Sequence, residues 1–158
     1  MRHKKVAKRQ IEADKIYNNL LVARFINRLM KDGKKTVAEK VVYATFDNLK
    51  AKGMDPLETF LKALDSVGPK VEIKARRIGG ANYQVPVEVK GDRRMALAIR
   101  WILEAAKGRP SKEYHSFAEK LIAEMLDAIE NKGEAIRKRD NMIRQAEANR
   151  AFAHFSRF

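Results

Sequence analysis

The sequence predicts a mainly α-helical single domain of about six helices, from which a two-stranded antiparallel β-ribbon protrudes. Apolar residues recur at helical spacing over most of the chain, whereas one segment at about 71 to 90 alternates with a period of two. A chain of 158 residues suits one core, which would bury roughly 70% of the surface that the unfolded chain exposes. One helical core with one protruding ribbon therefore accounts for both periodicities.

The two ends of the chain are expected to lie outside the helical domain. Residues 1–18 are rich in Lys and Arg and lack a sustained apolar face, which is typical of a basic N-terminal arm. The helical domain is expected to cover residues 19–149, and residues 150–158 to form a C-terminal tail.

Three helices are predicted before the ribbon. The core-facing residues are Leu21, Phe25 and Leu29 in the first helix, Val37, Val41, Ala44 and Leu49 in the second, and Leu57, Phe60, Leu61 and Leu64 in the third. The first is expected to end near residues 32–33, the second at Gly53 and the third at residues 68–69. The third has the clearest start, because Asp55 can accept from the amide of Glu58 while Pro56 occupies the first helical position.

The ribbon is predicted from two alternating stretches that flank a turn. Val71, Ile73 and Ala75 alternate with charged residues before the turn, and Val85, Val87 and Val89 alternate with Pro86, Glu88 and Lys90 after it. Gly79-Gly80-Ala81-Asn82 supplies residues that tolerate positive φ. Because two strands alone are marginally stable and Pro86 cannot donate a ladder hydrogen bond, we expect the ribbon to lean on the helices and to project from them.

Three further helices are predicted after the ribbon. The first follows Gly91-Asp92 and ends at the break 107–110, the second begins near Ser116 with Glu119 at capping-box spacing, and the third covers about 134 to 149. The core residues are Met95, Ile99, Ile102, Leu103 and Ala106 in the first of these, and Phe117, Leu121, Met125 and Ile129 in the second. The last helix has few large apolar residues, so one of its faces is expected to meet something other than core.

Composition favours a polyanionic partner and excludes several other classes. Thirty-four Lys and Arg against 20 Asp and Glu give a net charge of +14 and a pI near 10.1. No apolar run approaches the roughly 20 residues needed to span a bilayer, and the basic start does not lead into an apolar stretch, so we expect a cytoplasmic protein without a membrane partner. The absence of cysteine excludes disulfides, thiolate catalysis and cysteine-ligated zinc.

No motif in the sequence supports catalysis. Gly33-Lys34-Lys35-Thr36 lacks the Ser or Thr directly after Gly-Lys that a phosphate-binding loop needs, and Arg28 stands where that loop needs a glycine. The three histidines, His3, His115 and His154, have no ligand partner at helical spacing. We therefore expect no catalytic site, no metal and no cofactor.

Basic residues cluster at the predicted joints between elements, which favours a binding surface over the alternative that each merely faces water. Residues 119–134 are net acidic, so we expect a separate solvent-facing or protein-facing side. Tyr83 could stack on a base or pack along the ribbon, whereas Trp101 is expected in the core. The candidate contact residues are Arg2, Lys4, Lys5, Lys8, Arg9, Lys34, Lys35, Arg76, Arg77, Gly79, Gly80, Asn82, Tyr83, Arg93, Arg94, Arg109, Arg137, Lys138 and Arg139.

The run Arg76-Arg77-Ile78-Gly79-Gly80-Ala81-Asn82-Tyr83-Gln84-Val85-Pro86-Val87-Glu88-Val89 resembles the hairpin of the bacterial small-subunit ribosomal protein seven family. The same resemblance continues, in order, over most of the chain. The other segments that carry it are Phe25-Ile26-Asn27-Arg28, Asp32-Gly33-Lys34-Lys35, Arg100-Trp101, Arg137-Lys138-Arg139 and Ala146-Glu147-Ala148-Asn149-Arg150-Ala151-Phe152-Ala153-His154. The two ends differ from the usual family pattern.

The resemblance implies a structural rRNA-binding protein of the small ribosomal subunit. It implies binding to the 3′ major domain of the small-subunit rRNA early in head assembly, with the hairpin near the exit site for tRNA. Small-subunit ribosomal proteins nine and eleven are the implied neighbours, and some family members repress translation of their own mRNA. A DNA-bending architectural protein with a β-arm is the alternative from another class. An RNA-modifying enzyme has less support, since no cofactor loop or nucleophile accompanies it.

Overall fold

The computed structural model describes residues 10–157 and confirms the predicted fold class. The α-helices are α1 (Leu20–Leu29), α2 (Lys35–Ala51), α3 (Pro56–Val67), α4 (Gly91–Gly108), α5 (Phe117–Ile129) and α6 (Glu134–Ala148). The strands β1 (Val71–Ile78) and β2 (Ala81–Glu88) form one antiparallel pair between α3 and α4. A 3-10 helix, η1 (Arg150–Arg157), follows α6.

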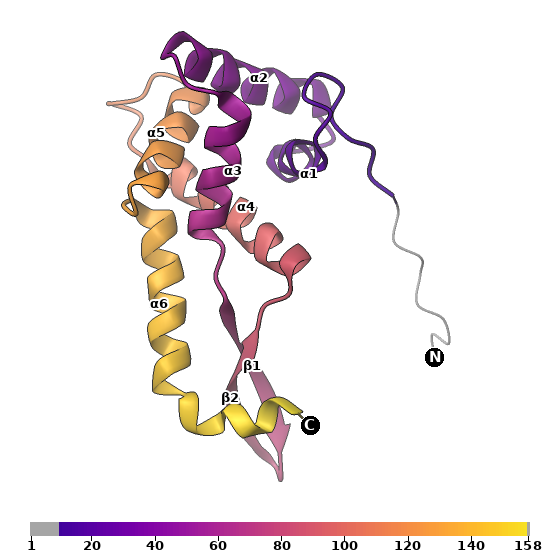
Figure 1. Cartoon of the computed structure of the whole chain (residues 1–158), viewed down its shortest axis with the longest axis vertical. Helices are drawn as coiled ribbons and strands as arrows, with labels where there is room; N and C mark the ends of the chain where they lie inside the picture. Colours follow the sequence, from indigo (N-terminus) through magenta and orange to yellow (C-terminus); the bar gives the residue numbers. More distant parts are fainter. Residues whose placement is uncertain (1–9, 158) are drawn as a thin grey trace.

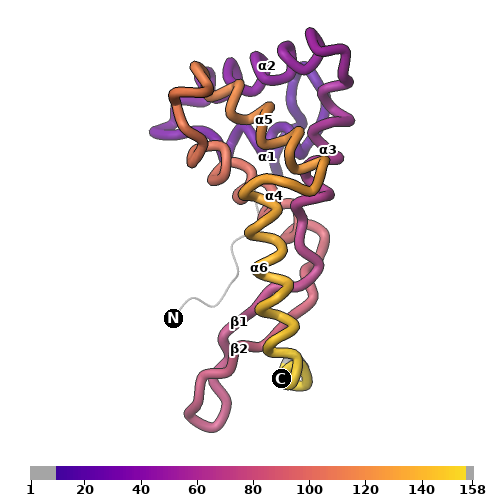
Figure 2. The backbone as a smooth tube through the Cα atoms, turned by 90° about the vertical axis from the view of Figure 1, so that its left-hand side faces the viewer, coloured from indigo at the N-terminus to yellow at the C-terminus, as the bar shows by residue number. Residues whose placement is uncertain are grey.

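The molecule consists of a helical body and a stalk. Helices α1 to α5 form the body, and the hairpin leaves it between α3 and α4 (Figure 1). Helix α6 leaves the body in the same direction, and both views show it running alongside the hairpin (Figure 2). Helix η1 then turns across and packs on β2. The stalk thus combines elements from the middle and the end of the chain.

The core of the body is built around three phenylalanines. Phe60 lies edge-on to Phe25 with ring centroids 5.2 Å apart, and Phe46 lies 5.8 Å from Phe60. All three are at most 1% exposed. Trp101 is buried in the same cluster, as predicted. Burial of such large side chains supplies most of the free energy that holds the body together.

The buried face of α2 matches the predicted one only in part, since Leu49 is buried and Val41 packs against the core but the other two predicted residues do not. Val37 is 55% exposed and Ala44 is also exposed, whereas the buried face consists of Ala38, Val42, Thr45, Phe46 and Leu49. A shift of one residue turns a helix by about 100°, so the wrong starting residue selects the wrong face. Phe46 sets the true face, because its ring packs on Phe60 in the centre of the core.

The starts of helices were predicted more accurately than the buried face of α2. Asp55 accepts from the amide of Glu58 at 2.8 Å, and Ser116 and Glu119 form the predicted capping box.

The hairpin turn is shorter than expected. Ile78 pairs with Ala81, so only Gly79 and Gly80 form the turn, with φ of +56° and +89°, and the predicted turn residues 81–82 belong to β2.

Both terminal segments pack on the rest of the protein. Asp14 is buried and accepts from the hydroxyl of Tyr43 at 2.8 Å, while Tyr17 lies edge-on to Phe46 at 4.8 Å. The chain is therefore attached to the body from Asp14 onward, within the segment expected to be an arm. The C-terminal segment forms η1 and lies against the hairpin.

Candidate nucleic-acid interface

The hairpin tip presents cationic side chains beside bare backbone. Arg77 lies opposite Asn82 in the strand register and is exposed, and Arg76 lies opposite Tyr83 and is half-buried. A Cβ added to either turn glycine would meet no atom within 4 Å. The turn backbone is therefore open to close approach by a ligand, next to the exposed guanidinium of Arg77.

The hairpin is braced along one face by the C-terminal elements. The ring of Tyr83 lies 5.3 Å from that of Phe152 and 5.2 Å from that of Phe155. The two phenylalanine rings are stacked, with centroids 6.4 Å apart. Packing between aromatic rings at such distances is favourable beyond the area that it buries. These three rings form an aromatic clamp, which explains how a ribbon of only two strands can be stable. The contact favours the alternative in which Tyr83 packs within the protein, and contact of Tyr83 with RNA stays a prediction.

Sequence reasoning missed the two phenylalanines of this clamp. Phe152 and Phe155 were placed in a tail, yet their spacing of three residues puts both rings on one side of a 3-10 helix, which has three residues per turn. That spacing was the available signal. The partner Tyr83 could not be inferred from it, because it lies about 70 residues away in the chain.

At the base of the hairpin, a buried carboxylate joins β1 to α4. Glu72 is 6% exposed and accepts from Nε and Nη2 of Arg93, both at 3.2 Å. The ammonium of Lys74 lies 3.1 Å from its other oxygen. Arg93 was predicted to contact the partner, and the structure shows that it already binds Glu72, although half of its side chain remains exposed.

Two predicted contact residues, Arg94 and Arg139, bind the end of α3. Arg94 donates to the carbonyls of Gly68 at 3.0 Å and Asp65 at 2.9 Å. Arg139 of α6 donates to the carbonyl of Ser66 at 2.7 Å. The last carbonyls of a helix lack intrahelical partners, and a cation is favourable there. These arginines therefore fix the point where the chain leaves α3 for the hairpin.

Arg109 is part of a buried network between α4, α5 and α6. Its Nε and Nη2 donate to one oxygen of Glu124 at 2.8 and 2.6 Å, and it also binds Asp127. Glu124 is 1% exposed, and its other oxygen accepts from the amide of Ala135 at the start of α6. Burial lowers the pKa of the Arg109 guanidinium, but its hydrogen bonds to Asp127 and Glu124 outweigh burial and leave that pKa above its ordinary value.

The remaining predicted cations of the described chain lie on the surface. Lys34 and Lys35 are exposed at the start of α2. On α6, Arg137 is 69% exposed beside Glu134, and Lys138 lies 2.7 Å from Glu104. The predicted arm contacts, Arg2, Lys4, Lys5, Lys8 and Arg9, lie outside the described residues. The structure thus separates these surface cations, of which Arg137 and Lys138 pair with carboxylates, from Arg94, Arg109 and Arg139, which hold elements of the protein together.

Three arginines that sequence reasoning did not select surround a hollow between α1 and α4. Arg24 and Arg28 come from α1 and Arg100 comes from α4. Their spacing of four residues along α1, and the position of Arg100 one turn after Ala96, place them on facing helix sides. The spacing of four residues could have indicated that Arg24 and Arg28 lie on one side of a helix. It could not have indicated that this side faces Arg100 of α4.

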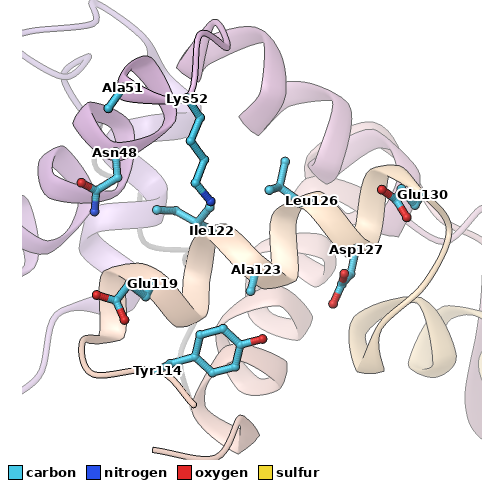
Figure 3. A pocket seen from close by; sticks show the side chains of 10 residues that line it. All are labelled: Asn48, Ala51, Lys52, Tyr114, Glu119, Ile122, Ala123, Leu126, Asp127 and Glu130. Carbon is cyan, nitrogen blue, oxygen red and sulfur yellow. The ribbon is translucent and has the colours of Figure 1, made fainter.

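A groove with a volume of about 680 Å³ lies between the end of α2 and the outer side of α5. Figure 3 shows Lys52, the residue that follows α2, reaching toward Ile122, with Glu119 and Asp127 on α5. These carboxylates already have partners. Glu119 accepts from the amides of His115 and Ser116, which lower its pKa, and Asp127 binds Arg109.

Neither a metal site nor a membrane-spanning helix was found in the described residues. Within residues 10–157, no group of three or more His, Cys, Asp or Glu side chains is placed to hold a metal ion. Over the same range, every helix is too short or too polar to cross a bilayer.

Comparison with known proteins identifies the family of the chain. Residues 1–150 match the family described as ribosomal protein S7p/S5e. Among curated relatives, the small ribosomal subunit protein uS7 of Dechloromonas aromatica is 53% identical over 155 residues, covering 98% of this chain and 97% of the relative. The uS7 proteins of Burkholderia mallei and Burkholderia thailandensis are each 54% identical over the same coverage. The chain therefore belongs to the ribosomal protein S7p/S5e family and is a structural protein of the small ribosomal subunit.

Proposed function

We propose that this protein binds the 3′ major domain of the small-subunit rRNA and nucleates assembly of the subunit head. The hairpin lies near the tRNA exit site, and small-subunit ribosomal proteins nine and eleven are the neighbours of the bound protein. It acts as a ribosome-bound, cytoplasmic protein without catalysis. Family membership supports the small-subunit role, the geometry of the stalk supports contact with folded RNA, and the choice of rRNA domain and neighbours rests on the family resemblance.

The observation that carries the proposal is a cationic hairpin that packs against η1 through Tyr83. A flexible ribbon would lose conformational entropy on binding RNA, whereas one clamped through Tyr83, Phe152 and Phe155 is ordered beforehand. Arg77 and the open glycine turn lie at its end. Such a stalk can enter a crevice of folded RNA and read shape and backbone without a base-reading helix.

The exposed cations are the best candidates for phosphate contacts. Lys34, Lys35, Arg77 and Arg137 lie on the surface at α2, the hairpin tip and α6. Arg76 is half-buried beside them. We also assign phosphate contacts to the N-terminal arm, because its sequence concentrates Lys and Arg. We assign Arg94, Arg109 and Arg139 to stability, because their guanidinium groups already bind carbonyls and carboxylates of the protein.

Competition binding tests the class of partner. At fixed salt, the protein should prefer the isolated 3′ major domain of the rRNA to duplex DNA of equal length and to another domain of the same rRNA. Equal or tighter binding to duplex DNA near physiological salt would instead support the DNA-bending alternative. The logarithm of affinity should fall with that of salt by roughly 0.7 to 0.9 per neutralised phosphate.

A matched pair of double variants tests the hairpin. Arg76→Ala/Arg77→Ala should weaken RNA binding and lower the salt slope by about one to two, because each arginine neutralises about one phosphate. Lys62→Ala/Lys132→Ala removes the same charge from side chains that are 61% and 71% exposed on α3 and beside α5, and should change affinity little. If the two double variants bind RNA equally well, the tip does not contact RNA.

A further inference from the structure

Glu72 is a buried carboxylate on an otherwise cationic face of the hairpin. It is 6% exposed, and Lys74 and Arg76, which follow it at alternate positions on the same face of β1, carry positive charge. Charged residues are seldom buried, and glutamate is uncommon in strands. Replacing a buried ion pair by apolar side chains of similar volume often leaves stability unchanged or raises it. Stability alone therefore does not account for a glutamate at this position.

The partner of Glu72 also occupies a position that local preferences disfavour. Arg93 is the third residue of α4, where the positive end of the helix dipole opposes a cation. Its Nε and Nη2 nevertheless donate to one oxygen of Glu72, and the ammonium of Lys74 lies against the other oxygen. Residues that break local rules together indicate a role beyond the folding of their own elements.

The Glu72–Arg93 pair is the polar link between the hairpin and the body. Within residues 10–157, no other hydrogen bond or ion pair joins a side chain of β1 or β2 to helices α1 to α5. The strand backbones approach those of α6 and η1, but that of no helix in the described body. Figure 1 shows the start of α4 and helix α6 on opposite sides of the hairpin base. The pair therefore holds the base on the side away from α6.

We propose that Glu72 is a positioning residue, which fixes the direction of the hairpin relative to the body so that the tip meets folded RNA at the correct place. The inference rests on the proposed function and names the contact that aims the stalk. Hydrogen bonds to a guanidinium are directional, whereas apolar packing is not. The strands continue roughly 23 Å beyond Glu72, so a tilt of about 10° at the base would displace the tip by about 4 Å, more than a hydrogen bond tolerates.

The charge of Glu72 gives the binding test a clear sign. A carboxylate does not bind phosphate, and its removal both releases Arg93 and raises the net charge of the protein. If charge alone governed binding, Glu72→Gln would therefore strengthen RNA binding. If Glu72 aims the hairpin, the same variant should weaken binding of the 3′ major domain about three- to tenfold, because the hairpin must then be ordered when the RNA binds.

Glu88→Gln provides the matched control. Glu88 is exposed on β2 opposite Val71, so the variant removes the same charge from the hairpin base without touching the Glu72–Arg93 pair. It should leave RNA affinity unchanged or raise it. If Glu72→Gln and Glu88→Gln bind RNA equally well, the positioning role is overturned.

The binding test requires that Glu72→Gln folds. The side chains of Arg93 and Lys74 are 49% and 53% exposed, so water can solvate both cations once Glu72 is neutral. The melting temperature should therefore fall by less than about 4 °C. Glu72→Asp keeps the net charge and shortens the side chain by one methylene, so it should give a smaller loss of affinity in the same direction.

A distance measurement without RNA tests the direction of the hairpin itself. The chain contains no cysteine, so Lys62→Cys on α3 and Ala81→Cys beside the turn can carry two spin labels at exposed positions. Double electron–electron resonance should give equally narrow distance distributions with Glu72 and in Glu88→Gln, and a distribution broader by about 4 Å in Glu72→Gln. A failure of the proposed function leaves this result intact, because no RNA is present.

The two measurements together decide the proposal. A broader distance distribution with weaker RNA binding supports it. An unchanged distribution overturns it at any affinity. A broader distribution with unchanged or tighter RNA binding shows that the direction of the hairpin does not serve binding, and also overturns it. If Glu72→Gln does not fold, Glu72→Asp gives the same two readouts with the same criteria.

Discussion

Removing the guanidinium of Arg109 should destabilise the protein without touching an RNA contact. Arg109→Ala deletes two of the three hydrogen bonds to the Glu124 carboxylate, which is 1% exposed, and leaves the third from the amide of Ala135. The carboxylate would then remain buried without its cation. Losing one partner of a buried pair typically costs about 3 to 5 kcal/mol.

The lower end of that range applies here. The Arg109 side chain is 16% exposed and Asp127 beside it is 40% exposed, so water can reach part of the vacated space. We expect a loss of about 3 kcal/mol, which corresponds to a fall in melting temperature of about 6 to 12 °C for a domain of this size. Arg137→Ala, at a side chain that is 69% exposed, should cost less than about 0.5 kcal/mol.

Urea and thermal melts of these variants, with RNA binding measured below the transition, provide the assay. Arg109→Ala/Glu124→Gln should be more stable than Arg109→Ala, since the neutral amide removes the buried charge and can still accept from the amide of Ala135. The folded Arg109→Ala protein should bind RNA like the wild type. A loss of RNA affinity with less than about 0.5 kcal/mol of destabilisation would make Arg109 an RNA contact and refute this reasoning.

Three further outcomes are expected. Phe60→Ala should cost about 3 to 5 kcal/mol in urea melts because the ring is fully buried, whereas Lys62→Ala should cost under about 0.5 kcal/mol; the reverse order would refute the register of α3. Gly68→Ala would place a Cβ 2.8 Å from the Arg94 side chain and should lower the free energy of unfolding by about 1 to 3 kcal/mol. An unchanged urea melt would contradict this expected clash. Burial, then a hydrogen bond to a carboxylate, raises the pKa of Tyr43 from 10.0 to about 12, so stability should fall as pH rises through that interval, and Tyr43→Phe should reduce this fall in alkaline melts.

Features that depend on neighbouring residues could be predicted from the sequence. The helix start at Asp55 needs only the next few residues, because the cap bonds to an amide three positions on. The capping box at Ser116 is equally local. The hairpin was found from alternation and two glycines, although its turn proved shorter than predicted. The fold class and these boundaries therefore followed from short-range physics.

Features that depend on tertiary contacts could not be predicted in the same way. The face of α2 is set by the contact of Phe46 with Phe60 and not by helical spacing alone, since two adjacent stripes both contain apolar residues. Basic residues looked alike in the sequence, yet Arg139 binds the carbonyl of Ser66, 73 residues away. Only the folded chain separates such an arginine from Arg77, which remains exposed. The roles of the predicted contact residues therefore required the structure.

A backbone footprint on full-length small-subunit rRNA tests the central claim most directly. The protein, added alone to the folded rRNA, should protect sites confined to the 3′ major domain. Arg76→Ala/Arg77→Ala should remove a discrete subset of these protections and leave the others in place, because the hairpin tip and the helical body contact different parts of the RNA. Protection spread evenly over all domains, or concentrated in a domain other than the 3′ major one, would contradict the account.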